Sequence, residues 1–237
     1  MDWIERTEIL LGQDMLQDLK HKHILIVGLG GVGSYAAELI ARAGVGNFTI
    51  VDGDTVNASN INRQLPALTS TINMAKADVV AQRLLDINPE LNLTVINSFI
   101  DEDSFEELVS KGFDFVVDAI DTLSPKVALI KSAVDTKTPI ISAMGAGGKF
   151  DPAQIKIADI SKSEYCMLAR SVRKRLYKQG IRKGVKVVFS TEEAPKEYVI
   201  KTEGERNKKS TLGTISYLPA MFGCYAASYV IRTLTGK

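Results

Sequence analysis

Short apolar runs rich in β-branched residues alternate with segments of helical periodicity from residue 23 onward. The apolar runs cover residues 23–28, 48–52, 93–99, 113–119 and 139–144, and the helical segments cover about 32–43, 75–87, 102–110 and 125–135. Strands that are apolar on both faces and separated by helices are typical of a parallel sheet covered on both sides. We therefore predict an α/β, Rossmann-like fold with a mostly parallel sheet and helices on both faces.

The pattern changes after Gly145. Residues 146–160 predict a turn and a strand, residues 186–192 predict another strand, and both would extend the sheet or form a small cap. The polar stretch from Glu193 to Ser210 predicts a mobile loop. The uncharged stretch from Thr211 to Ile231 is long enough to span a bilayer, but its small and polar residues favour a helix buried in the core or at a dimer interface.

Composition narrows the class of protein. The chain has 237 residues, of which 45% are hydrophobic and 24% charged, so we expect one domain with a filled core rather than disorder. Cys166 and Cys224 stand alone, which excludes a disulfide framework and CxxC zinc ligands. Charged residues interrupt the apolar N-terminus, so we predict no secretory signal and a cytoplasmic protein.

Positive charge is concentrated in one segment. Residues 162–186 contain nine Lys and Arg against Glu164 alone, a local excess of eight positive charges in a chain of net charge +1. Such a patch favours a polyanionic partner, although a solvated helix face is the alternative. The cations that we expect to contact the partner are Arg170, Arg173, Lys174, Arg175, Lys178, Arg182 and Lys183, and helical spacing predicts one shared face for the first three.

A glycine-rich turn follows the first predicted strand. The chain runs from 23–28 through Gly28, Gly30, Gly31 and Gly33 into a helix, a spacing that lets phosphate approach backbone amides at a helix N-terminus. Nineteen residues past Gly33 the second strand ends in Asp52, which can accept hydrogen bonds from ribose hydroxyls, and Asp54 is a second candidate. Taken alone, this pattern suits a dinucleotide-binding oxidoreductase equally well.

The residues after Asp54 favour a nucleoside triphosphate instead. Asn60, Arg63 and Gln64 lie in a polar stretch, and Lys76 begins a helix thirteen residues after Arg63. Cations and amides aimed at the glycine turn can neutralise a triphosphate, whereas a nicotinamide needs an apolar slot. Asp121 follows the fourth strand, and we expect it to face the same cleft and hold Mg²⁺ against the phosphates.

These pieces together resemble the adenylating enzymes of the ubiquitin-activating superfamily, which includes the ThiF, MoeB and HesA proteins. The matching motifs are GLGGVGS, IVDGDTVNASNINRQ, Lys76 in MAKA, and DAID. The resemblance implies that ATP is bound through Asp52 at the ribose, through Asn60, Arg63 and Lys76 at the phosphates, and through the magnesium-linked Asp121. It also implies catalytic roles for Arg63, Lys76, Asp121 and Arg6, with Arg6 contacting the ATP of an opposite subunit.

The C-terminal half resembles the bacterial tRNA threonylcarbamoyladenosine dehydratases through residues 145–176 and 188–192. The resemblance implies adenylation of the threonyl carboxylate on tRNA and intramolecular closure to a cyclic form, in a homodimer sometimes associated with a cysteine desulfurase system. It divides the chain into an N-terminal helical segment (1–22), a nucleotide-binding core (23–145) and a substrate-binding, tRNA-binding and dimerisation part (146–237).

The alternative function is that of an activator that adenylates the C-terminal glycine of a small sulfur-carrier protein. Cys166 could be reactive beside the basic segment or simply buried.

Overall fold

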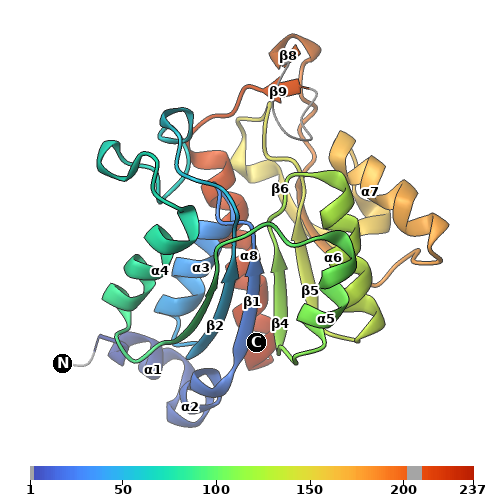
Figure 1. Ribbon diagram of the computed structural model, residues 1–237. Helices are drawn as coiled ribbons and strands as arrows, with labels where there is room; N and C mark the ends of the chain where they lie inside the picture. The colour runs from blue at the N-terminus through green and yellow to red at the C-terminus, as the bar shows by residue number, and fades with distance from the viewer. Residues whose placement is uncertain (1–2, 202–209) are drawn as a thin grey trace.

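The computed structural model describes residues 3–201 and 210–237, and its centre is a seven-stranded sheet (Figure 1). The strand order is β3-β2-β1-β4-β5-β7-β6, and every pair is parallel except β6 with β7. The strands are β1 (His23–Val27), β2 (Asn47–Val51), β3 (Asn92–Ile96), β4 (Phe115–Asp118), β5 (Ile140–Ala143), β6 (Ile155–Asp159) and β7 (Lys186–Ser190). The predicted α/β, mostly parallel fold is confirmed.

Helices cover both faces of the sheet because the central strands are apolar on both sides. The first face packs against α3 (Gly33–Arg42), α4 (Lys76–Ile87) and α8 (Tyr217–Thr235). The second face packs against α5 (Phe105–Val109), α6 (Leu123–Asp135) and α7 (Met167–Lys178). Successive residues of β1 therefore point into different cores: Ile24 and Ile26 belong to the first, and Leu25 and Val27 to the second.

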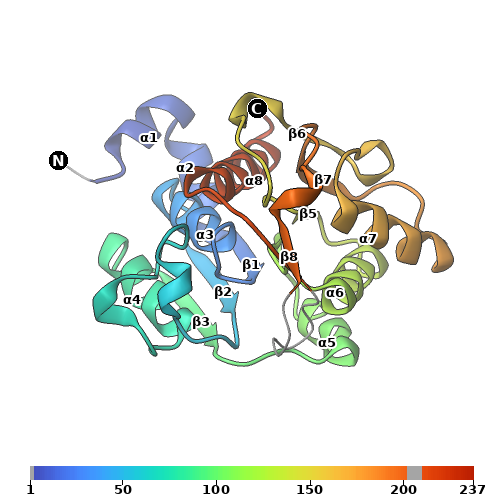
Figure 2. The same ribbon diagram turned by 90° about the horizontal axis from the view of Figure 1, so that it is seen from above.

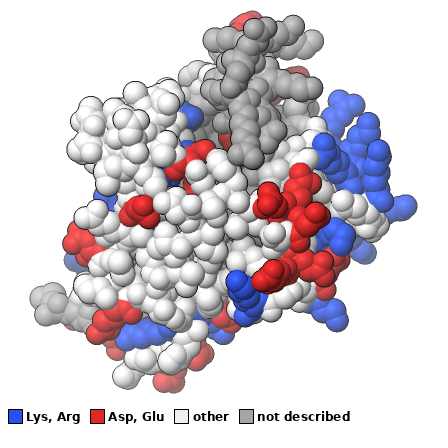
Figure 3. Space-filling model, viewed as in Figure 1, with Lys and Arg blue, Asp and Glu red and all other residues white. Residues whose placement is uncertain are grey.

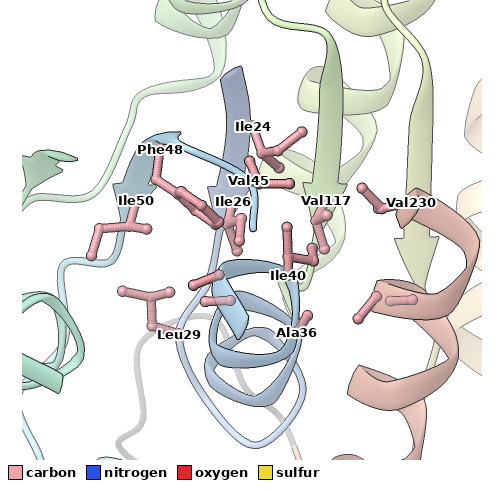
Figure 4. Packing of buried hydrophobic residues seen from close by; sticks show 14 of the residues in the cluster. Ile24, Ile26, Leu29, Ala36, Ile40, Val45, Phe48, Ile50, Val117 and Val230 are labelled. Atoms are coloured by element: carbon pink, nitrogen blue, oxygen red, sulfur yellow. The ribbon is translucent and has the colours of Figure 1, made fainter. Parts of the chain in front are cut away.

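The first core is built around β1 and α3. Figure 4 shows Ile26 of β1 and Phe48 of β2 directed toward Ile40 of α3, with Val230 of α8 closing the far side. The four side chains are completely buried. α3 is consequently held against the sheet along its length, and the position of its N-terminus is fixed relative to the ends of the strands.

The strand order reverses between β1 and β4, because the chain leaves β1 toward β2 and β3 and then returns to place β4 on the other side of β1. At such a switch point the loops after the two strands diverge and leave a crevice at the carboxyl edge, where α/β proteins bind ligands. The glycine turn follows β1 and the predicted magnesium residue Asp121 follows β4. The topology thus brings these two sequence motifs to one edge.

The C-terminal half differs from the sequence prediction in two places. The stretch from Glu193 was predicted to be a loop, but it contains a short hairpin of β8 (Val199–Lys201) and β9 (Ser210–Leu212), and the intervening 202–209 lies outside the described residues. The terminal helix was expected from Thr211, but α8 begins at Tyr217 and runs to Thr235. Pairing of 210–212 in the hairpin removes these residues from the helix.

The N-terminal segment forms two short helices, α1 (Glu5–Leu11) and α2 (Gln13–His21), below the amino ends of the strands. Leu16 of α2 and Ile4 close the end of α3, since a Cβ on Gly44 would lie 2.7 Å from Leu16 Cδ1 and 3.0 Å from Ile4 Cδ1. In residues 3–201 and 210–237 no helix combines the length and apolarity that crossing a membrane requires.

Candidate active site

The glycine turn after β1 forms a close backbone crossing with the first turn of α3. A Cβ on Gly33 would lie 1.7 Å from the Gly28 carbonyl oxygen, so no other residue fits at that position. Gly28 has φ +90° and faces Ala119 after β4, whose carbonyl oxygen would be 2.7 Å from an added Cβ. The crossing places the N-terminus of α3 next to the carboxyl ends of β1 and β4, and a helix N-terminus is where a phosphate can approach backbone amides.

Asp52, at the end of β2, closes one side of the turn. Its Oδ2 accepts a hydrogen bond from the Leu29 amide at 2.6 Å, and its Oδ1 accepts one from the Asp54 amide at 2.8 Å. Burial raises the pKa of the Asp52 carboxyl, while the charge of Lys76 and the two amides oppose that rise. These two hydrogen bonds hold the carboxylate beside the glycine turn, the position expected of an acceptor for ribose hydroxyls.

Lys76 is a buried cation whose charge acts on the Asp52 carboxylate. The residue is 5% exposed, and its Nζ lies 2.8 Å from Oδ2 of Asp54, whose side chain is 54% exposed. The Lys76 amide also donates to the Asp54 carbonyl oxygen at 3.0 Å, so both ends of the lysine are tied to the loop after β2. A desolvated ammonium of this kind interacts strongly with an incoming anion.

The other predicted phosphate-binding residues lie on one short turn, with different contacts. Asn60 Oδ1 accepts from the Asn57 amide, and Arg63 Nη1 donates to the Ser59 carbonyl oxygen and to Asn62 Oδ1. Gln64 lies over Gly30, whose added Cβ would be 3.5 Å from Gln64 Nε2. Gln64 Oε1 is buried and has no hydrogen-bond partner among the described residues. An orphaned polar atom beside the glycines is a position that a polar ligand can satisfy.

The end of β4 carries a buried ion pair. Asp118 Oδ2 lies 2.7 Å from Lys126 Nζ and accepts a hydrogen bond from Ser142 Oγ at 2.5 Å, and both charged side chains are 0% exposed. Asp118 Oδ1 accepts from the Ile120 amide at 3.0 Å. The pair therefore fixes the turn that presents Asp121, which is exposed at the crevice edge.

Sequence reasoning missed Lys126 and Ser142. The available signal was Asp118, a carboxylate that ends a fully buried strand and so requires a partner, together with a lysine eight residues later on the following helix. Ser142 on β5 could not be assigned, because nothing in its local sequence identifies the strand it would face.

The predicted basic surface lies on α7 and the residues after it. Lys and Arg gather at the right of Figure 3 over this helix. Arg170, Lys174 and Lys178 are exposed at four-residue spacing and form one stripe. Arg173 departs from the expected shared face, because its Nη1 donates to the carbonyl oxygen and hydroxyl of Ser163, both at 2.7 Å. Arg175 Nη1 reaches Ser124 Oγ on α6 at 2.6 Å.

Two further predictions concern a metal and a thiol. Within the described part of the chain no three His, Cys, Asp or Glu side chains converge as a protein-only metal site would require. Cys166 is a free, half-buried thiol whose Sγ accepts from the Ala169 amide at 3.4 Å and caps α7. Its contacts are those of a helix cap, and a covalent role stays a prediction.

The comparisons with known proteins agree with this geometry. The sequence profile described as "ThiF family" matches residues 5–237. This chain belongs to the ThiF family. The resemblance to adenylating enzymes predicted from the four sequence motifs is thereby confirmed.

Three relatives place the chain within the ThiF family. It is 40% identical to the tRNA threonylcarbamoyladenosine dehydratase of Bacillus subtilis, over 97% of this chain and 93% of the relative. The crystal structure of the Escherichia coli enzyme, TcdA, in complex with ATP has a TM-score of 0.88 and 36% identity, covering 98% of this chain and 93% of that one. The molybdopterin-synthase adenylyltransferase of Haemophilus influenzae is 39% identical but matches only 54% of this chain.

The buried ion pair of this ThiF-family fold has a measurable consequence. We expect Lys126→Met to lower the free energy of unfolding by about 3–5 kcal/mol, because Asp118 is left as an uncompensated buried charge. Urea denaturation measures the loss. The matched control is Lys131→Met on the same helix, whose exposed ion pair with Asp135 contributes less than about 1 kcal/mol. Equal losses in the two variants would contradict the assignment.

Proposed function

We propose that this protein is an ATP-dependent tRNA threonylcarbamoyladenosine dehydratase. The observation that carries the proposal is the likeness to dehydratases along nearly the whole chain, including the half that begins after β5. The adenylyltransferase of molybdopterin synthase matches only 54% of this chain, which disfavours activation of a carrier protein. An oxidoreductase is disfavoured because a buried cation, Lys76, pairs with Asp54 in the loop after β2, whereas a nicotinamide needs an apolar slot.

The reaction begins with attack by the threonyl carboxylate on the α-phosphorus of ATP. The new carboxylate oxygen–phosphorus bond forms as the bond to the β-phosphate oxygen breaks, giving an acyl-adenylate and pyrophosphate. An atom of the carbamoyl group then attacks the acyl carbon, and AMP leaves with one of the two carboxylate oxygens. An N–H proton of the carbamoyl group passes to solvent, so the cyclic product has lost one water overall. Both steps depend on positioning and charge neutralisation, so no protein nucleophile is needed.

ATP fits the described geometry. The amides at the start of α3 face the phosphates, Asp52 accepts from the ribose, and Lys76 with Arg63 neutralises the phosphate chain. The Gly28–Gly33 crossing places the N-terminus of α3 at the carboxyl edge of the sheet, and the orphaned Gln64 Oε1 is an unsatisfied polar group beside the same glycines. In this arrangement Asn60 keeps the Arg63 turn in place through its cap on Asn57.

Mg²⁺ fits a site with few protein ligands. The ion commonly binds through one or two carboxylates and the substrate phosphates, and exposed Asp121 at the crevice edge provides such a carboxylate. When bound, Mg²⁺ would neutralise charge on the phosphates. Asp121 would hold it there, and the Asp118–Lys126 pair would keep the Asp121 turn rigid.

tRNA would lie on the part of the chain after β5, with the α7 stripe on its phosphates. Arg170, Lys174 and Lys178 are the cations that the fold leaves free to point outward, and Arg182 and Lys183 follow on an exposed turn. Arg173 and Arg175 stay predicted RNA contacts, although each already bonds to a neighbouring segment.

A homodimer and a cysteine desulfurase partner stay predictions. Exposed Ile9 and Leu10, at 78% and 79%, give α1 an apolar surface that a second subunit could cover. Arg6 is exposed on the same helix, which packs at the end of α3 opposite the glycine turn. A contact from Arg6 to ATP would therefore be made across subunits.

The function is tested by pyrophosphate release from ATP and Mg²⁺ with two RNAs, tRNA bearing threonylcarbamoyladenosine and the same tRNA without it. We expect turnover only with the modified tRNA, and a loss of 18 mass units from the nucleoside, because one water is removed. Mass spectrometry of the digested tRNA measures it. ATP binding without turnover on either RNA would favour a carrier protein as the substrate.

Lys76→Met is expected to lower kcat/KM, because a desolvated cation on the phosphates is removed. The decrease should correspond to a loss of about 2–4 kcal/mol of transition-state stabilisation. The matched control is Lys22→Met, which breaks a 3.2 Å ion pair with Asp114 at the opposite edge of the sheet. Steady-state pyrophosphate release compares the two variants. Unchanged kinetics for Lys76→Met would remove this lysine from the site.

Salt dependence tests the α7 stripe. Changing Arg170, Lys174 and Lys178 together to Gln is expected to reduce the slope of log affinity against log salt by about 2, because three phosphate contacts are lost. A control with equal charge loss changes exposed Lys111, Lys131 and Lys137 to Gln. Filter binding of tRNA gives both slopes. An equal reduction in the control would show that only net charge matters.

A further inference from the structure

Two exposed aromatic rings from distant segments meet beside the hairpin β8–β9. Phe150 follows the glycine-rich loop after β5, and Tyr198 ends the turn before β8. Their ring centroids are 6.1 Å apart with an interplanar angle of 68°, and the residues are 50% and 38% exposed. In this edge-to-face geometry the two rings do not stack on each other, and both residues stay partly exposed. The proposed ATP site uses neither residue.

The backbone under Phe150 is held from two sides. Its amide donates to the Glu192 carboxylate at 2.9 and 3.0 Å, and its carbonyl oxygen accepts from Tyr217 Oη at 2.9 Å. The preceding Lys149 is buried, and its Nζ donates to the backbone carbonyl oxygen of Tyr165 at 3.3 Å. The exposed ring thus projects from a fixed backbone, so little conformational entropy is lost when a ligand packs on it.

The same contacts place the pair between the ATP site and the basic helix. Tyr217 begins α8, and two residues later Pro219 packs on the glycine turn, where an added Cβ on Gly31 would be 2.9 Å from Pro219 Cβ. On the other side, Tyr165 lies two residues before α7. Figure 2 looks down on the hairpin, which stands above the sheet with α8 on one side and α7 on the other.

We infer that Phe150 and Tyr198 form a stacking platform for an unpaired base of the RNA substrate, next to the adenosine that is activated. The inference rests on the proposed function. Unpaired bases bind to proteins chiefly by stacking on aromatic rings, while lysines and arginines hold the backbone phosphates. An exposed aromatic pair that Lys149 connects to the segment leading into α7 combines these two elements, and the positive charge of α7 favours RNA over a peptide as the occupant.

The test uses the full-length protein and a short RNA hairpin whose loop carries threonylcarbamoyladenosine. Phe150→Ala/Tyr198→Ala should weaken RNA binding about 10- to 100-fold, the effect of losing one stacked base. The slope of log affinity against log salt should stay unchanged, because no phosphate contact is lost. Lys174→Gln should instead lower the slope. The matched control Phe150→Tyr/Tyr198→Phe keeps both rings and should bind as the wild type does. Fluorescence anisotropy measures RNA affinity, and ATP affinity should be equal in all variants.

Several results would overturn the inference. RNA affinity of the alanine variant equal to that of the wild type would overturn it while leaving the dehydratase function intact. A loss that the ring-exchange control shares, or one accompanied by lost ATP affinity, would assign the rings a structural role. Wild-type protein that binds no RNA would refute the proposed function as well. Weakened binding of a glycine-terminated carrier peptide, with RNA binding unchanged, would assign the pair to a protein substrate.

Discussion

The contact between Gly28 and Gly33 is the constraint on which the candidate site depends. The carbonyl oxygen at the end of β1 occupies the space where a side chain at Gly33 would begin, so α3 starts directly against the strand. This close crossing places the N-terminus of α3 at the carboxyl edge of the sheet, and the Leu29 amide that follows Gly28 donates to Asp52. The buried apolar packing of α3 on β1 and β2 holds the crossing in place, because the helix cannot withdraw without exposing that core (Figure 4).

The charged side chains of the candidate site and of α7 differ in how deeply they are buried. Asp118 and Lys126 are fully buried and paired with each other, so they support the structure under the β4 turn rather than contact a ligand. Lys76 is buried but pairs with the exposed Asp54, which leaves its ammonium within reach of the crevice. Arg170, Lys174 and Lys178 are exposed on α7, where they suit a large polyanion. The degree of burial thus separates the supporting ion pair from the lysine proposed to bind nucleotide and from the cations proposed to bind RNA.

The C-terminal helix α8 contacts both the glycine turn and the segment that carries the aromatic pair. Its first turn contacts the glycine turn through Pro219 and the Phe150 backbone through Tyr217, and Thr214 just before it accepts a hydrogen bond from Asn62 at 3.0 Å. A single rigid element therefore sets the distance between the nucleotide and the aromatic pair. Such positioning is what a reaction without a protein nucleophile needs, because its rate depends on how the carboxylate meets the α-phosphate.

The sequence alone determined the fold class, the four glycines and the aspartate at the end of β2, because periodicity and the steric needs of a tight turn are local properties. The motifs also predicted membership of the adenylating family, which the profile match confirms. Tertiary structure decided what depends on contacts between different helices, strands and loops. Lys126 on α6 bonds to Asp118 on β4 and to Ser142 on β5. The Arg173 side chain donates to Ser163, and the ring of Phe150 contacts that of Tyr198, 48 residues later in the chain. Strand order and helix packing bring these partners together, and local sequence patterns contain no record of either.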